Sequence, residues 1–165
     1  MWPFRRSNNK LGFTRDREGN LTVELTTDEQ AEARKTFQMF EGYSVHKSVA
    51  EIFERGLTAF ALANYAKSQA IASQFTSNTV ETQGLLEKAV AAILKACSIH
   101  ELPIYLYDSG CLFEMLGKGQ AATDMFHNFV RSQAVFEPTQ LNELFLRNRD
   151  IDEAVRDARA KLRMG

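Results

Sequence analysis

Both cysteines and two of the three histidines are the residues of this sequence best suited to bind a metal ion. They are Cys97, His100, Cys111 and His127. Zinc accepts thiolate and imidazole ligands, but structural zinc sites usually draw them from two tightly spaced pairs. Here one pair is tightly spaced, and Cys97 and Cys111 fall on expected apolar or concave positions of helices. We therefore expect no metal ion and no other cofactor.

The usual catalytic patterns do not occur in the sequence. His46 stands alone at the expected start of a helix, without a serine–histidine–aspartate order, a phosphate-binding glycine loop or a dinucleotide motif. The paired carboxylates of Asp152 and Glu153 fall in the expected first turn of a helix, where negative charge stabilises the helix dipole. The sequence therefore predicts a protein that is not an enzyme.

Length and composition indicate one globular domain. A chain of 165 residues is long enough to bury about 70% of the surface that it exposes when unfolded. Twenty basic and 21 acidic residues give a net charge of −1, which provides no general attraction to nucleic acid or anionic lipid. The sequence lacks both a disulfide framework and an apolar run of membrane-spanning length. We expect a cytoplasmic protein that neither binds nucleic acid nor crosses a membrane.

Helical periodicity of the apolar residues begins at residue 26 and continues to the end of the sequence. The segment Thr27 to Gln30 has capping-box spacing, and Gly42 offers a left-handed stop for the first helix. Seven helices are expected, at about 28–41, 45–74, 80–99, 103–116, 119–135, 138–145 and from 151 onward. These elements predict an all-α fold, an antiparallel stack of helix-turn-helix units over residues 26–165.

Residues 1–25 differ from the rest because they are polar and lack helical periodicity. Leu21, Val23 and Leu25 alternate after a possible turn at Glu18 to Asn20, which is typical of a short hairpin. An isolated hairpin is only marginally stable in water. A flexible arm and a short hairpin both remain open for this segment.

The segment YDSGCLFEMLGKGQAATDMF, residues 107–126, combines small and aromatic residues in a way that suits a tight helical hairpin. Gly110 and Ala122 would mark the close contact between two antiparallel helices, because helices approach closely where side chains are small. Phe113 and Phe126 would fill the space beside that contact. Gly117 would make the turn that reverses the chain.

This spacing resembles the tetratricopeptide repeat, a helix-turn-helix unit of about 34 residues. The resemblance covers about residues 84–138, as one good unit from 103 to 136 and half a unit before it. It departs from the family pattern at Leu106, Ser109 and Phe129, and its closing proline, Pro138, comes late. The resemblance implies a right-handed superhelix of hairpins. The alternative is an ordinary helical hairpin that uses small residues at its crossing.

The same resemblance implies a function, because the first helices of such repeats line a groove that binds a peptide or helix of another protein. Carried over to this sequence, that face consists of Ile104, Tyr107, Asp108, Cys111, Glu114 and Met115. Its acids and soft apolar groups would suit a partner with basic and apolar side chains. The alternative is that these residues are buried under neighbouring helices.

We therefore expect a non-enzymatic adaptor or scaffold. A second hypothesis is a helical bundle that forms homodimers through the long helix at 45–74 and acts as a structural or regulatory subunit. A third is a small-ligand binder or an enzyme whose motif is not recognised; convergent polar side chains in a pocket would favour it.

Overall fold

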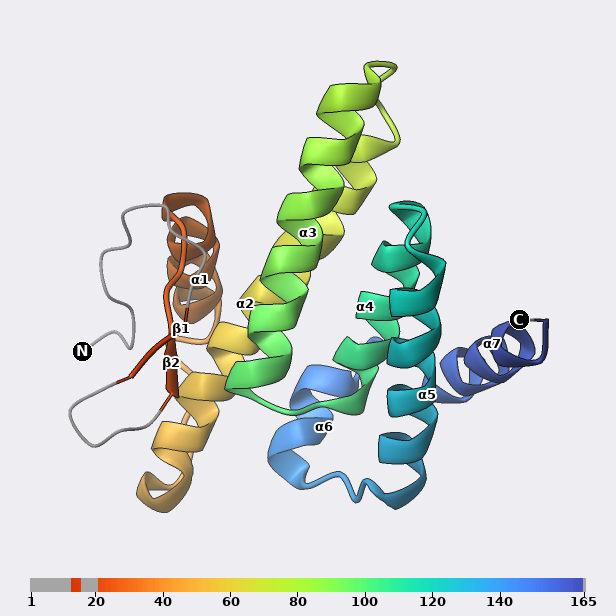
Figure 1. Ribbon diagram of the computed structural model, residues 1–165. Coiled ribbons are helices and arrows are strands. Elements are labelled where there is room, and N and C mark those ends of the chain that lie inside the picture. Colours follow the sequence, from red (N-terminus) through yellow and green to blue (C-terminus); the bar gives the residue numbers. More distant parts are fainter. Residues whose placement is uncertain (1–12, 16–20, 165) are drawn as a thin grey trace.

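The computed structural model describes residues 13–15 and 21–164, and its helices confirm the predicted all-α fold with about seven helices (Figure 1). The N-terminal elements are β1 (Phe13–Arg15), β2 (Leu21–Val23), α1 (Thr27–Met39), the 3₁₀ turn η1 (Lys47–Val49) and α2 (Ala50–Ser73). They are followed by α3 (Thr79–Ile99), α4 (Pro103–Met115), α5 (Gly119–Val135), α6 (Gln140–Leu146) and α7 (Ile151–Met164).

The N-terminal segment enters the helical core before α1 begins. Strands β1 and β2 pair antiparallel, with Phe13 opposite Val23, and β2 packs against α3. Leu25 is 1% exposed and belongs to the core. Residues 1–12 and 16–20 of the predicted arm or hairpin lie outside the described residues.

The two predicted boundaries of the first helix need correction. The N-cap is Thr26, whose side chain accepts from the Glu29 amide while the Glu29 carboxylate accepts from the Thr26 amide. The capping box therefore lies one residue before the predicted Thr27–Gln30, because the carboxylate is a stronger acceptor for an amide than a neutral side chain is. The helix also ends at Met39, before Gly42. Gly42 does not make the predicted left-handed stop, because Gly117 is the glycine with a positive φ among the described residues.

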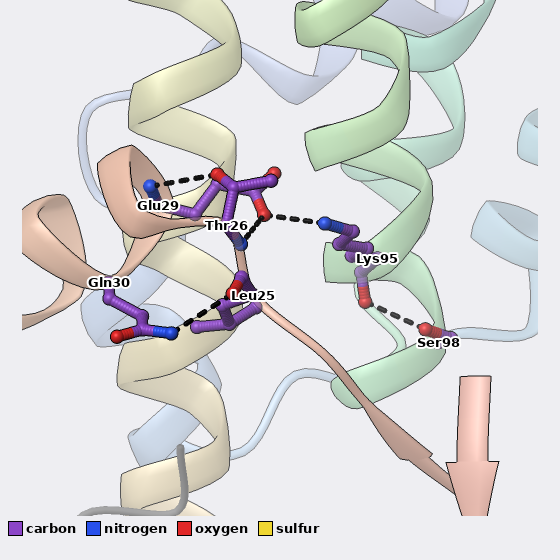
Figure 2. A network of polar contacts seen from close by, with 6 residues as sticks. All are labelled: Leu25, Thr26, Glu29, Gln30, Lys95 and Ser98. Carbon is purple, nitrogen blue, oxygen red and sulfur yellow. Dashed lines mark hydrogen bonds and ion pairs between the residues drawn. The ribbon is translucent and has the colours of Figure 1, made fainter. Parts of the chain in front are cut away.

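A buried ion pair attaches the start of α1 to the C-terminal part of α3 (Figure 2). The Glu29 carboxylate lies 2.5 Å from the Lys95 ammonium, with side chains 2% and 5% exposed. The same carboxylate also accepts from the Thr26 amide, so its charge is shared between two donors. A buried charge that loses its partner is costly. This pair therefore fixes the position of α1 against α3.

Removal of the carboxylate charge should destabilise the fold more than removal of both charges. We expect Glu29→Gln to lower the free energy of unfolding by about 3–5 kcal/mol, since Lys95 then remains buried and unpaired. The double variant Glu29→Gln with Lys95→Met should lose less than the single variant. Urea unfolding checks both values, with the exposed Glu54→Gln as the control. A loss below about 1 kcal/mol for Glu29→Gln would contradict this role.

Two helical hairpins, α2–α3 and α4–α5, form most of the fold, and the first projects beyond the second in Figure 1. Helices α2 and α3 pack against each other, and both carry alanines that are at most 2% exposed: Ala59, Ala61, Ala66, Ala89, Ala92 and Ala96. Small side chains allow the two helix axes to approach closely. Helix α6 packs on α2, where a Cβ added to Gly56 would lie 2.6 Å from the Phe145 ring.

The predicted reversal of the chain at Gly117 occurs as expected. Gly117 has φ +75°, a conformation that disfavours other residues. Its amide donates to the Glu114 carbonyl and the Lys118 amide donates to the Phe113 carbonyl, both at 2.9 Å. These two bonds define a Schellman motif at the end of α4. Helix α5 then packs against α4.

Gly110 makes room for a neighbouring helix, as predicted, and its surroundings identify the ring of Phe126 as the nearest group. The three atoms nearest to an added Cβ all belong to the Phe126 ring, the closest at 2.6 Å. Ala122 is buried, at 2% exposure, but it is not what Gly110 contacts most closely. The missing side chain therefore makes room for an aromatic ring, and the close approach of the two backbones at Gly110 and Ala122 stays a prediction.

A Gly→Ala substitution should have opposite effects at two helical glycines. In Gly110→Ala the new methyl overlaps the buried Phe126 ring, and we expect a loss of about 1–3 kcal/mol in unfolding free energy. In Gly84→Ala nothing lies within 4 Å of the new methyl, and we expect a gain of about 0.5–1 kcal/mol from helix propensity. Thermal or urea unfolding measures both. Stabilisation of both variants would show that Phe126 does not restrict residue 110.

Candidate partner-binding site

Helix α4 is the element around which the C-terminal half of the protein is arranged. It packs against α3, α5 and α7. Pro103 occupies its first position, where the missing amide costs no helical hydrogen bond. Because α4 has neighbours on several sides, the predicted site residues along it face different helices.

Helix α7 packs on the α4–α5 hairpin with the small side of an amphipathic helix. Ala154 and Ala158, one turn apart, are 5% and 0% exposed. The acidic first turn of α7 and its basic last turn both suit the helix dipole. Asp150 caps the helix by accepting from the Glu153 amide, as its position in the sequence predicts.

The first polar contact of this interface joins the α6–α7 connection to α4. Arg149 donates two hydrogen bonds to Asp108, from Nη1 to Oδ2 at 2.9 Å and from Nη2 to Oδ1 at 2.6 Å. Two parallel bonds of this kind give both energy and fixed geometry. The hydrogen bond to Asp108 raises the pKa of the Arg149 guanidinium.

The second contact joins Tyr107 to the middle of α7. The Tyr107 hydroxyl donates to Asp157 Oδ2 at 2.5 Å. The Tyr107 ring lies 5.8 Å from the Phe126 ring and 5.4 Å from the Phe129 ring, centre to centre. Burial and the hydrogen bond to Asp157 raise the pKa of Tyr107, so the hydroxyl stays protonated as a donor.

In the third contact, the ammonium of Lys161 on α7 lies near two carboxylates and an aromatic ring. Its ammonium is 2.5 Å from Glu114 Oε1, 3.4 Å from Asp157 Oδ2 and 5.2 Å from the centre of the Phe126 ring. Burial lowers the pKa of Lys161, but the hydrogen bond to Glu114 and the nearby carboxylates outweigh it and the net direction is upward. The lysine therefore remains charged at this position.

The six residues predicted to bind a partner do not share one open surface. Tyr107, Asp108 and Glu114 contact α7 or the connection before it. Cys111 is half-buried, and burial raises the pKa of its thiol. Met115 is 43% exposed, whereas Ile104 is 1% exposed and unavailable to a partner in this conformation. Three of the six predicted residues are thus already bound by α7 or by the connection before it.

Sequence reasoning missed that α7 is the helix lying on this face. The signal for charged contacts was present in the alternation of bases and acids from residue 147 to 163. Three side chains of this segment form hydrogen bonds or ion pairs with polar groups on α4. They are Arg149, Asp157 and Lys161. Nothing in the spacing alone indicates which acid each base would meet.

The four candidate metal ligands are not brought together. Cys97 Sγ lies 3.8 Å from Ser109 Oγ, and His100 Nε2 lies 2.8 Å from Asn142 Oδ1. His127 is exposed on α5. Within residues 13–15 and 21–164, no three histidine, cysteine, aspartate or glutamate side chains are grouped so as to hold a metal ion.

The long helix predicted as a dimer interface is mostly occupied by other elements of the chain. Helix α2 contacts α1, α3 and α6, and ten of its residues are buried. Its larger exposed apolar residues, Ile52 and Ile71, are 40% and 46% exposed and lie more than five turns apart. Homodimer formation therefore stays a prediction.

Comparison with known proteins gives no relative for this chain: no family model, curated protein or solved structure matches it. Among the helices that the structure describes, none combines the length and the apolar character needed to cross a membrane.

The ring and the hydroxyl of Tyr107 should make separable contributions. We expect Tyr107→Phe to lower the unfolding free energy by about 1–2 kcal/mol through the lost bond to Asp157, and to speed hydrogen exchange of the α7 amides. Tyr107→Ala should cost about 3–5 kcal/mol, since the ring also packs on Phe126 and Phe129. Urea unfolding with exchange mass spectrometry measures both effects. Equal costs for the two variants would show that the ring contacts add nothing.

Proposed function

We propose that the protein is a non-enzymatic interaction module whose α4–α5 hairpin, similar to a tetratricopeptide unit, binds an amphipathic helix of another protein. The supporting observation is the seating of α7 on this hairpin through Asp108, Tyr107 and Glu114. The face therefore has the chemistry to hold a helix with small and basic residues. In this conformation the chain's own helix occupies it.

The contacts that hold α7 are of the kind that a competing helix can replace. The charged side chains of the two ion pairs to α4 are 24–40% exposed, and exposed pairs contribute about 0–1 kcal/mol each. The buried apolar residues of α7 are two alanines, and its larger apolar residues, Ile151, Val155 and Leu162, are only partly buried against the core. Helix α6 is attached separately, by Phe145 against Gly56 of α2. Helix α7 can thus leave while α6 stays.

The observed occupant defines the chemistry of the partner. A partner helix needs two small residues four positions apart, like Ala154 and Ala158, so that it can approach the hairpin. An acid and a base four positions apart, like Asp157 and Lys161, would meet Tyr107 and Glu114. A basic residue before the helix would meet Asp108, as Arg149 does.

The proposal can be tested with the full chain and a labelled peptide of residues 149–164. In the variant Ala158→Asp, the new carboxylate cannot be buried against the hairpin, so α7 leaves and its site opens. We expect this variant to bind the peptide at least about tenfold more tightly than the unchanged protein, where α7 competes. Fluorescence anisotropy measures the affinity.

The control is Arg159→Asp, which introduces the same side chain at an exposed position of α7. It should bind the peptide like the unchanged protein. A peptide carrying Lys161→Glu should bind the Ala158→Asp variant more weakly, because it places a second acid beside Glu114. If the Ala158→Asp variant stays folded by circular dichroism and fails to bind the peptide, the proposed function is wrong.

A further inference from the structure

The surface of the protein has a hollow beside α4. It lies on a different side of α4 from the one that α7 covers. It has a volume of about 600 Å³ and is formed by the end of α3, the start of α4 and the end of α5. Its lining consists of Leu94, Cys97, Ser98, Glu101, Leu102, Pro103, Leu106, Ser132, Val135, Phe136 and Glu137. No residue of α6 or α7 belongs to this lining, so the hollow is separate from the interface described above.

The residues that line this hollow are largely apolar and are held in place by the fold. Leu102 is 1% exposed, and Leu94, Leu106 and Phe136 are partly buried against the core. The Cys97 thiol adds a neutral, polarisable surface, because burial raises its pKa to about 11. A site of this size and character suits the apolar body of a small ligand.

The charged groups at the rim have one sign. Glu101 and Glu137 are the ionisable residues of the lining besides Cys97, and both are exposed at the mouth. Helices α3 and α5 also end here, at Ile99 and Val135, and neither has a basic residue in its last turn. A helix C-terminus carries a partial negative charge, and the start of α4 in the same lining carries a partial positive one, so the preference for a cation depends on Glu101 and Glu137.

We propose that this hollow binds a small organic cation with an apolar body, such as an aralkylamine. The apolar body lies against Leu94, Leu106 and Phe136, and the ammonium lies at the mouth between Glu101 and Glu137. The two serines of the lining, Ser98 and Ser132, offer further oxygen acceptors to the ammonium. The apolar lining thus binds the hydrocarbon part of the ligand, and the two glutamates bind its ammonium group.

The test uses ¹⁵N-labelled full-length protein and three probes of one shape: 4-phenylbutylamine, 4-phenylbutanol and 4-phenylbutyrate. At pH 7 the amine is cationic, since its pKa is near that of lysine, about 10.4. We expect saturable amide shifts confined to residues 94–106 and 132–137, with a Kd of about 1 mM or tighter for the amine. The alcohol should bind at least about fivefold more weakly, and the carboxylate should not bind.

A double variant, Glu101→Gln with Glu137→Gln, isolates the charge contribution. It should weaken binding of the amine to the level of the alcohol and leave binding of the alcohol unchanged, which a misfolded protein would not do. The control Glu41→Gln with Glu54→Gln removes the same charge at exposed positions elsewhere and should change neither affinity.

Three results would overturn the proposal: equal affinity for amine and alcohol, no saturable shift in the hollow, or shifts that centre on other residues. A peptide with lysine between leucine and phenylalanine is the fourth arm. If it binds the hollow at least about tenfold more tightly than the amine does, the site receives a protein segment instead of a small ligand. Because the shifts are assigned residue by residue, these results are independent of the peptide test on α7.

Discussion

The contact between the Phe126 ring and the backbone of Gly110 is the constraint on which the C-terminal half of the protein depends. The ring lies where a side chain of residue 110 would begin, so it fixes how α5 lies along α4. The ring also lies near the Tyr107 ring and the Lys161 ammonium. One buried side chain thus connects the crossing of the hairpin to the surface that receives α7. Helix packing and the candidate site share this residue, which is 2% exposed.

Helix α4 contributes residues to both proposed sites, the partner site and the hollow, on different sides of the helix. Tyr107, Asp108 and Glu114 meet the small and charged residues of α7. Leu102, Pro103 and Leu106 form part of the hollow at the end of α3 and α5. Packing of α5 against α4 keeps both surfaces in fixed relation. A ligand in the hollow would therefore bind beside a helix whose other side carries the proposed partner site.

Most helix boundaries could be predicted because they follow from local rules. Pro103 starts α4, Gly117 reverses the chain and Asp150 caps α7, and each acts through its own backbone or the next turn. The choice between Thr26 and Thr27 as N-cap was wrong, since two adjacent threonines both have an acceptor-bearing residue three positions later. The carboxylate at position 29, which also meets Lys95, decides in favour of Thr26.

The candidate site was less predictable because it depends on contacts distant in sequence. The small residue at position 110 indicated a close approach, but its spacing could not distinguish Ala122 from Phe126 as the group approached. The acids on α4 indicated basic ligands. That the base comes from residues 149 and 161 of the same chain depends on where α6 turns, which Phe145 sets by packing on Gly56. No local pattern encodes such a long-range arrangement.

The order of the helices along the chain has a consequence for the protein as it is synthesised. Translation completes Val135, the end of α5, 29 residues before Met164, the end of α7. At cellular elongation rates this interval lasts on the order of a few seconds, which is long compared with the folding of a helical hairpin. During that time the helix that covers the acids of α4 has not yet been made. Helix α7 is therefore the last of the described helices that can join the fold during synthesis.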